Sequence, residues 1–134
     1  MFKIAVAVVL LAHGIGHSMG LLQIFKVAAV NPEWHGDSWL LNGPVGTTAT
    51  QAVGGLLWTV AIVGFAALAA VVVGWLPTTW FVPLAIASSL VSLAGVALFP
   101  IAFPVLSTLG AAVVDVAVLA SAVWFHWLPG DPAV

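Results

Sequence analysis

The sequence predicts an all-α integral membrane protein, a four-helix bundle of antiparallel spans with both termini on the same side of the membrane. Of its 134 residues 4% are charged and 63% are hydrophobic, whereas roughly a quarter of the residues in soluble proteins are charged. No charged residue lies between Asp37 and Asp115, and this stretch can cross a bilayer twice at about 20 residues per span. The chain is expected to form one membrane domain over residues 1–134.

Proline and glycine mark the ends of the expected spans. The first ends before Asn31-Pro32, because proline lacks the amide donor that a helix needs. Its apolar run is too long for a typical signal peptide and no small-residue cleavage site follows it, so it is expected to be retained. Pro83 is tolerated in the first turn of the third span, where amides have no intrahelical partner. The helices are expected at residues 2–27, 50–74, 81–98 and 105–127, with a polar loop at 28–49.

Charge and composition exclude several functions. The chain contains two Lys, no Arg and no Cys. It therefore has no basic surface for nucleic acid and no thiolate for a disulfide, a metal site or a nucleophile. Lys3 and Lys26 lie at opposite ends of the first span, so the distribution of positive charge does not select the side of the membrane on which the termini lie.

Three ionisable side chains, His13, His17 and Asp115, are expected at the depth of the bilayer centre. Such groups are costly in a membrane and usually face the interior of a bundle, so each is a candidate functional residue. His13 and His17 lie one turn apart on one helix face. Asp115 falls near the centre of the fourth span, at the same depth, so the three side chains can form one cluster.

Small and hydroxylated residues support this cluster. Gly16 and Gly20 share the face of the two histidines, and a Gly-x-x-x-Gly spacing lets another helix approach closely. We therefore expect the bundle to pack through its first and fourth spans. Ser89 and Ser92 in the third span lie near the same depth and can complete a polar core.

Three chemistries can use His13, His17 and Asp115. Two histidines with one carboxylate form the ligand set of a zinc site or a non-haem iron site, so a divalent metal ion is one candidate cofactor. A buried Asp/His pair can instead relay a proton. The imidazoles and serines can also bind a polar head group or a quinone-like carbonyl by hydrogen bonds. Set against these is a purely structural role, in which the cluster locks helix packing.

Two other histidine positions give weaker indications. Glu33, His35 and Asp37 in the polar loop can gather a cation, although short patterns of this kind are more often solvated loops. His126 lies between Trp124 and Trp127, a composition typical of an interfacial aromatic belt.

The stretch Ala12-His13-Gly14-Ile15-Gly16-His17 resembles a group of small bacterial four-helix membrane proteins whose first helix carries Ala-His-Gly-x-x-His. The segments Leu40-Leu41-Asn42-Gly43 and Gly54-Gly55-Leu56-Leu57-Trp58 are similar to that group's entry to the second helix. More distantly, the first helix is similar to that of DoxX-type membrane proteins, where His17 is usually replaced by Lys. The resemblance implies four helices and assigns no reaction.

The leading functional hypothesis is a multi-pass protein of the cell membrane with an intramembrane site for a metal, a small ligand or protons. The candidate site residues are His13, His17, Asp115, Ser89 and Ser92. The alternative is a non-catalytic accessory or assembly subunit, whose partner is a second copy or a larger membrane complex. Hydrolase chemistry is the least favoured, because no Ser-His-acid set is evident and water would have to reach the site.

Overall fold

A computed structural model describes residues 1–27, 33 and 35–129. These residues form helices and connecting turns, and no strand occurs among them. The prediction of an all-α chain is therefore confirmed. The elements are α1 (Phe2–Gly16), α2 (Ser18–Ile24), α3 (Asn42–Val72), the short 3₁₀ helix η1 (Thr78–Trp80), α4 (Phe81–Leu98) and α5 (Val105–Val123).

Four helical stretches have the length and apolar composition needed to cross a membrane: Phe2–Ile24, Asn42–Val72, Thr78–Leu98 and Val105–Val123. The second begins earlier than residue 50, because the chain is helical from Asn42 onwards. It is kinked at Gly46, whose φ of 80° lies in a region that glycine adopts readily. The fourth ends at Val123, short of residue 127. The expected polar loop lies partly at residues 28–32 and 34, outside the described residues.

The first span is broken at His17, between α1 and α2. There the backbone tightens, with the amide of His17 donating to the carbonyl of Gly14 at 3.1 Å and the amide of Gly20 donating to that of His17 at 3.0 Å. These are the i to i−3 bonds of a 3₁₀ turn, which in the middle of a helix often marks a functional position. The break lies beside the polar cluster described below.

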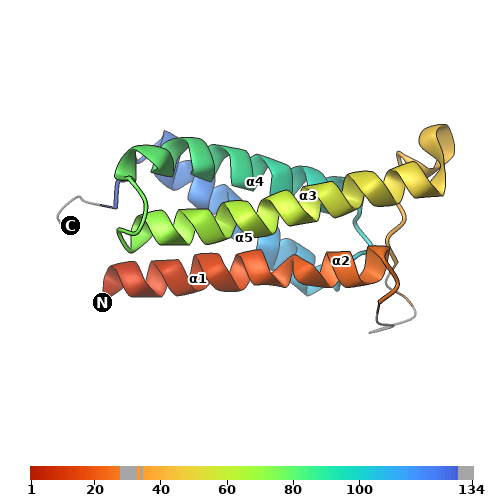
Figure 1. Ribbon diagram of the computed structural model, residues 1–134, viewed down its shortest axis with the longest axis horizontal. Helices are drawn as coiled ribbons and strands as arrows, with labels where there is room; N and C mark the ends of the chain where they lie inside the picture. The colour runs from red at the N-terminus through yellow and green to blue at the C-terminus, as the bar shows by residue number, and fades with distance from the viewer. Residues whose placement is uncertain (28–32, 34, 130–134) are drawn as a thin grey trace.

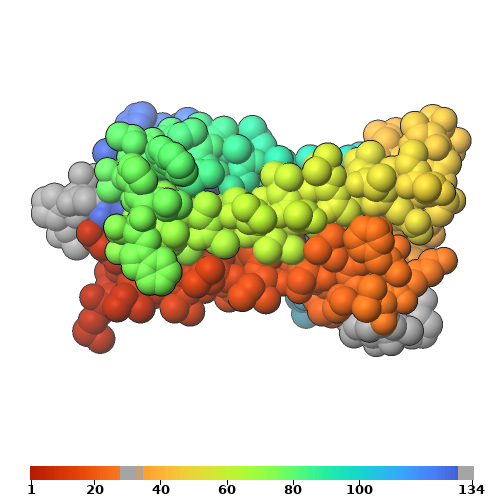
Figure 2. All heavy atoms as spheres, viewed as in Figure 1, coloured from red at the N-terminus to blue at the C-terminus, as the bar shows by residue number. Residues whose placement is uncertain are grey.

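Helix α3 lies at the centre of the packing. It packs against α1, α2 and α4, and α5 packs against α4. Figure 1 shows these helices running along one long axis, and in Figure 2 α3 crosses the visible face between α1 and α2 on one side and α4 on the other. The helices α1 and α5 approach each other less closely than these pairs do. The first and fourth of these stretches do meet, through the contact of 2.9 Å between His13 of α1 and Asp115 of α5, but a wider seam lies between their backbones than between those of the other pairs.

Aromatic contacts show which helix ends lie together. The rings of Phe2 and Trp127 are 6.2 Å apart, and those of Phe81 and Trp127 are 5.1 Å apart. The start of α1, the start of α4 and the segment after α5 therefore meet at one end of the bundle. At the other end, the indole nitrogen of Trp39 donates to the carbonyl of Ala97 at 2.8 Å.

Trp58 is the largest fully buried side chain. Its indole ring fits between α2 and α4 because a glycine of each helix faces the ring. A Cβ atom on Gly20 of α2 would lie 2.7 Å from the ring, and one on Gly95 of α4 would lie 2.6 Å from it. Because real Cβ atoms do not approach so closely, both positions depend on glycine for this packing. Trp58 thereby joins α2, α3 and α4 next to the polar cluster.

Candidate functional site

Asp115 is the centre of a buried hydrogen-bonded cluster that joins three helices. Its carboxylate oxygen Oδ1 lies 2.9 Å from Nε2 of His13, and Oδ2 accepts a bond of 2.6 Å from the hydroxyl of Ser92. The same hydroxyl oxygen lies 3.0 Å from Nε2 of His17. Asp115 and Ser92 are fully buried, and the His13 side chain is 7% exposed. The four side chains therefore form one continuous chain, His17–Ser92–Asp115–His13.

The single proton of Ser92 sets the direction of this chain. A hydroxyl has one hydrogen to donate, and Ser92 donates it to Asp115. The bond between Ser92 and His17 then requires that Nε2 of His17 carry a hydrogen and donate it to the Ser92 oxygen. If Asp115 is ionised it can only accept, and Nε2 of His13 then donates as well. The second ring nitrogen of each imidazole, Nδ1, takes no part in these bonds.

Aromatic side chains enclose the two imidazoles. The ring of His17 stacks on Trp58 with centroids 5.3 Å apart, and the ring of His13 meets Phe65 edge-on at 4.4 Å. Phe103, in the turn before α5, lies 6.3 Å from His17. These contacts leave little freedom for either imidazole and surround the polar chain with apolar groups. Because a low local dielectric strengthens hydrogen bonds, the chain is held in one arrangement.

A cavity of about 330 Å³ adjoins the histidine side of this cluster, between α1 and α5. Its volume is within the ~300–1,000 Å³ typical of small-molecule sites. Both imidazoles line it, and Phe103 and the hydroxyl-bearing Ser107 lie in its wall. The remaining lining residues are small or aliphatic: Val9, Ala12, Gly16, Gly110, Ala111 and Val114. The polar cluster is thus buried among the helices on one side and faces an open space on the other.

The geometry does not support the metal-site interpretation of His13, His17 and Asp115. No group of three His, Cys, Asp or Glu side chains in the described part of the chain is arranged to hold a metal ion. Zinc ligands must converge on one point at ~2.0–2.2 Å. Here the Ser92 hydroxyl lies between His17 and Asp115, and both carboxylate oxygens already accept bonds from protein groups.

The other predicted residues have different surroundings. Ser89 is buried, but its hydroxyl has no hydrogen-bond partner among the described residues, so it does not join the cluster. Gly20 does allow close packing, against Trp58, whereas a Cβ on Gly16 would meet nothing within 4 Å. Gly16 instead lines the cavity. On α1 the close approach occurs at Gly14, where a Cβ would lie 3.0 Å from Cβ of Phe65.

The described residues of the loop are not arranged as a cation site. Nδ1 of His35 lies 3.1 Å from Oδ2 of Asp37, with both side chains about half exposed, and Oδ1 of Asp37 accepts a bond from the side-chain amide of Asn42 at 2.8 Å. Glu33 is described, but no cluster of three ligating side chains includes it. The solvated-loop interpretation therefore fits this segment better.

Sequence reasoning missed four residues that shape the site: Trp58, Phe65, Phe103 and Ser107. Their side chains are ordinary for a membrane span, so residue type alone does not single them out. For Trp58 one indication existed, because a tryptophan within a span lies away from the interfaces where tryptophan is enriched. Phe103 and Ser107 lie beside the cavity because of the turn before α5, which hydropathy does not position.

No protein-family model, curated protein or solved structure matches the chain. The functional argument therefore depends on the geometry of the cluster and its cavity.

Proposed function

We propose that this chain is a multi-pass membrane protein that binds the polar group of a small ligand against His13 and His17. The same residues can pass a proton between the ligand and Asp115. In this proposal the four apolar helices cross the cell membrane as antiparallel spans, with both termini on one side. Their outer surfaces contact the lipid bilayer. Polar groups at that depth are expensive and usually functional.

One observation carries the proposal: the two imidazoles of the buried hydrogen-bonded chain also line a 330 Å³ cavity. The cavity opens at the surface of the bundle, so a molecule from outside the protein can reach the two imidazoles. A ligand in the cavity would contact both ring systems and the Ser107 hydroxyl. Binding and helix locking are compatible.

The order of hydrogen bonds supports proton transfer. If a ligand gives a proton to Nδ1 of His17, the Nε2 hydrogen of His17 can pass to Ser92 and the Ser92 hydrogen can pass to Asp115, without any heavy atom moving. His17 would then accept from Ser92, and Ser92 would accept from a protonated Asp115. The bonds of 2.6 and 3.0 Å along this path are within hydrogen-bond range.

Binding can be tested with para-fluorophenol, a small uncharged ring with one hydroxyl, followed by fluorine NMR with the full chain in detergent micelles. We expect saturable line broadening with the wild type. Gly16→Leu should abolish it, because Gly16 lines the cavity and a Cβ there meets nothing within 4 Å, so that the leucine side chain can extend into the cavity. Thermal unfolding of the variant should remain close to that of the wild type for the same reason.

Gly43→Leu is the matched control. A Cβ at Gly43 also meets nothing within 4 Å, and Gly43 lies at the start of α3, away from the cavity. This variant should bind para-fluorophenol as the wild type does. If the wild type shows no saturable binding, or if Gly16→Leu binds unchanged, the cavity is not a ligand site and the cluster is a structural lock of an accessory subunit.

A further inference from the structure

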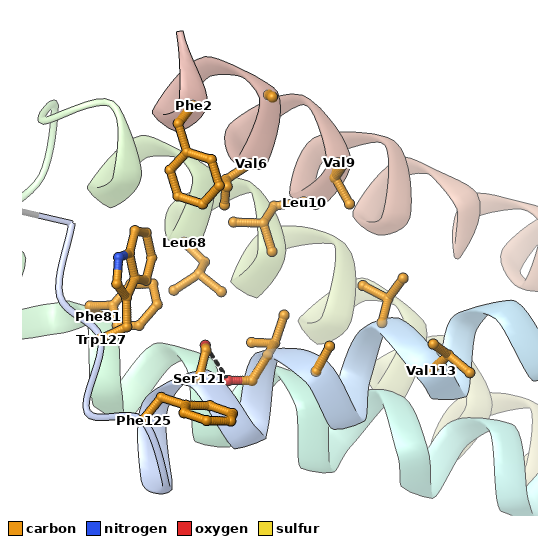
Figure 3. A pocket seen from close by; sticks show the side chains of 14 residues that line it. Phe2, Val6, Val9, Leu10, Leu68, Phe81, Val113, Ser121, Phe125 and Trp127 are labelled. Atoms are coloured by element: carbon orange, nitrogen blue, oxygen red, sulfur yellow. Dashed lines mark hydrogen bonds between the residues drawn. The ribbon is translucent and has the colours of Figure 1, made fainter. Parts of the chain in front are cut away.

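A second, larger cavity follows the α1–α5 seam towards the N-terminal end of α1. It has a volume of about 580 Å³. Figure 3 shows Phe2, Phe125 and Trp127 at one end of this groove and Val9 and Val113 at the other. Ser121 also lies in its wall, but its hydroxyl donates to the carbonyl of Val118 at 2.7 Å. The groove therefore presents an almost wholly apolar surface.

The groove and the histidine-lined cavity are neighbours along the seam. Val9 of α1 and Val114 of α5 line both of them. The seam thus has a polar part at His13 and His17 and an apolar part that extends from Val9 to Phe2. A single elongated molecule can occupy both parts only if one of its ends is polar and the rest is apolar.

We infer that the α1–α5 seam binds a single-chain amphiphile, whose small uncharged ring or hydroxyl-bearing head lies in the cavity and whose alkyl tail lies in the groove. This inference depends on the proposed function, since the head is the ligand of the cavity. It adds the class of ligand and the position of its tail.

The dimensions of the groove favour one chain of moderate length. Between Val9 and Phe2 a helix rises ~10 Å at 1.5 Å per residue, so an extended tail of about eight carbons, which advances ~1.3 Å per bond, fills this distance. The aromatic rings of Phe2 and Trp127 lie at the far end. A longer tail would continue past them towards the end of the bundle.

The lining of the cavity favours an uncharged head. No Lys, Asp or Glu among the described residues lines it, and Asp115 is fully buried behind His13 and Ser92. Burial of a charged head without a counter-charge is costly. The imidazoles and the Ser107 hydroxyl can instead bond to a hydroxyl or a carbonyl group.

Lipid tails are as apolar as the groove, so moving an alkyl tail from the bilayer into the groove releases little free energy by itself. The head must therefore supply the selectivity, and the tail must follow the groove because the head is held at its inner end. A specific ligand can therefore be distinguished from bulk lipid, because its tail should be found in the groove only when the cavity is free to accept its head.

The test uses para-octylphenol with a photoreactive diazirine at the end of its tail, added to the full chain in lipid nanodiscs. After irradiation, mass spectrometry locates the labelled residues. We expect labels concentrated at the groove residues near the ends of α1 and α5, and competition by excess unlabelled para-octylphenol. Ala117→Phe, which places a ring in the groove, should lower this labelling about tenfold. Val116→Phe on an exposed position of α5 outside both cavities should leave it unchanged.

The two proposals can fail separately. Ala117→Phe should still bind para-fluorophenol, because it leaves the cavity open. If para-fluorophenol binds but the tail labels are spread evenly over the exposed positions of α5, the amphiphile inference is wrong and the proposed function stands. The same conclusion follows if the groove is unlabelled because a second copy of the chain covers it, which cross-linked dimers would reveal. If para-fluorophenol does not bind, the proposed function itself is wrong.

Discussion

Trp58→Ala is expected to lower the free energy of unfolding by ~3–5 kcal/mol, the range for removal of a large aromatic side chain from a packed core. Trp58 is fully buried between Gly20 and Gly95, and neither glycine has a side chain that can fill the space left behind. The variant also removes the ring on which His17 stacks at 5.3 Å. Unfolding by titration with a denaturing detergent in mixed micelles measures this loss.

Trp80→Ala is the control for this prediction, because Trp80, the last residue of η1, is 51% exposed. We expect a much smaller change there. Equal losses from the two substitutions would show that the indole of Trp58 is not enclosed by α2, α3 and α4 as described.

Asp115→Ala is expected to destabilise the bundle by ~1–3 kcal/mol, since hydrogen bonds measured in membrane proteins contribute ~0.6 kcal/mol on average and up to ~1.7 kcal/mol each and Asp115 makes two. Without the carboxylate, the Nε2 atom of His13 and the hydroxyl of Ser92 lose their acceptor. Asp115→Asn keeps the shape and one carbonyl acceptor, so it should cost less than the alanine variant. The same unfolding titration compares the two.

A double-mutant cycle between His13 and Asp115 tests the specific contact. The variant with both residues replaced by alanine should be more stable than the sum of the single losses predicts, by ~0.5–3 kcal/mol for residues in direct contact. If the losses of stability from the two single variants add to that of the double variant within ~0.5 kcal/mol, the 2.9 Å bond between His13 and Asp115 is contradicted, because such additivity is typical of distant sites.

The four apolar helices were predictable because segment length and composition determine them directly. Breaks such as the turn before α5 follow from proline, whose effect on helices is local. The beginning of α3 was less predictable, since the chain is helical from Asn42 and passes through a non-helical Gly46. Local residue preferences do not show that a helix resumes beyond such a kink.

The candidate site was predictable at the level of residues and depth. His13, His17, Ser92 and Asp115 stood out because polar groups are rare within membrane spans, and the structure brings these four together. The order of helices around the bundle was not predictable, because hydropathy is insensitive to which helices are neighbours. The seam between α1 and α5, its two cavities and the role of Gly16 as a cavity wall all depend on that order.

The most direct test of a ligand-facing polar chain is histidine-selective nitrogen NMR of the full chain in micelles, with and without para-fluorophenol. The chain has four histidines, and His35 and His126 are exposed away from the cavity, so they serve as internal controls. The account predicts that the probe shifts the ring-nitrogen resonances of His13 and His17 and leaves those of His35 and His126 in place. Unchanged spectra, or equal shifts at all four histidines, would contradict it.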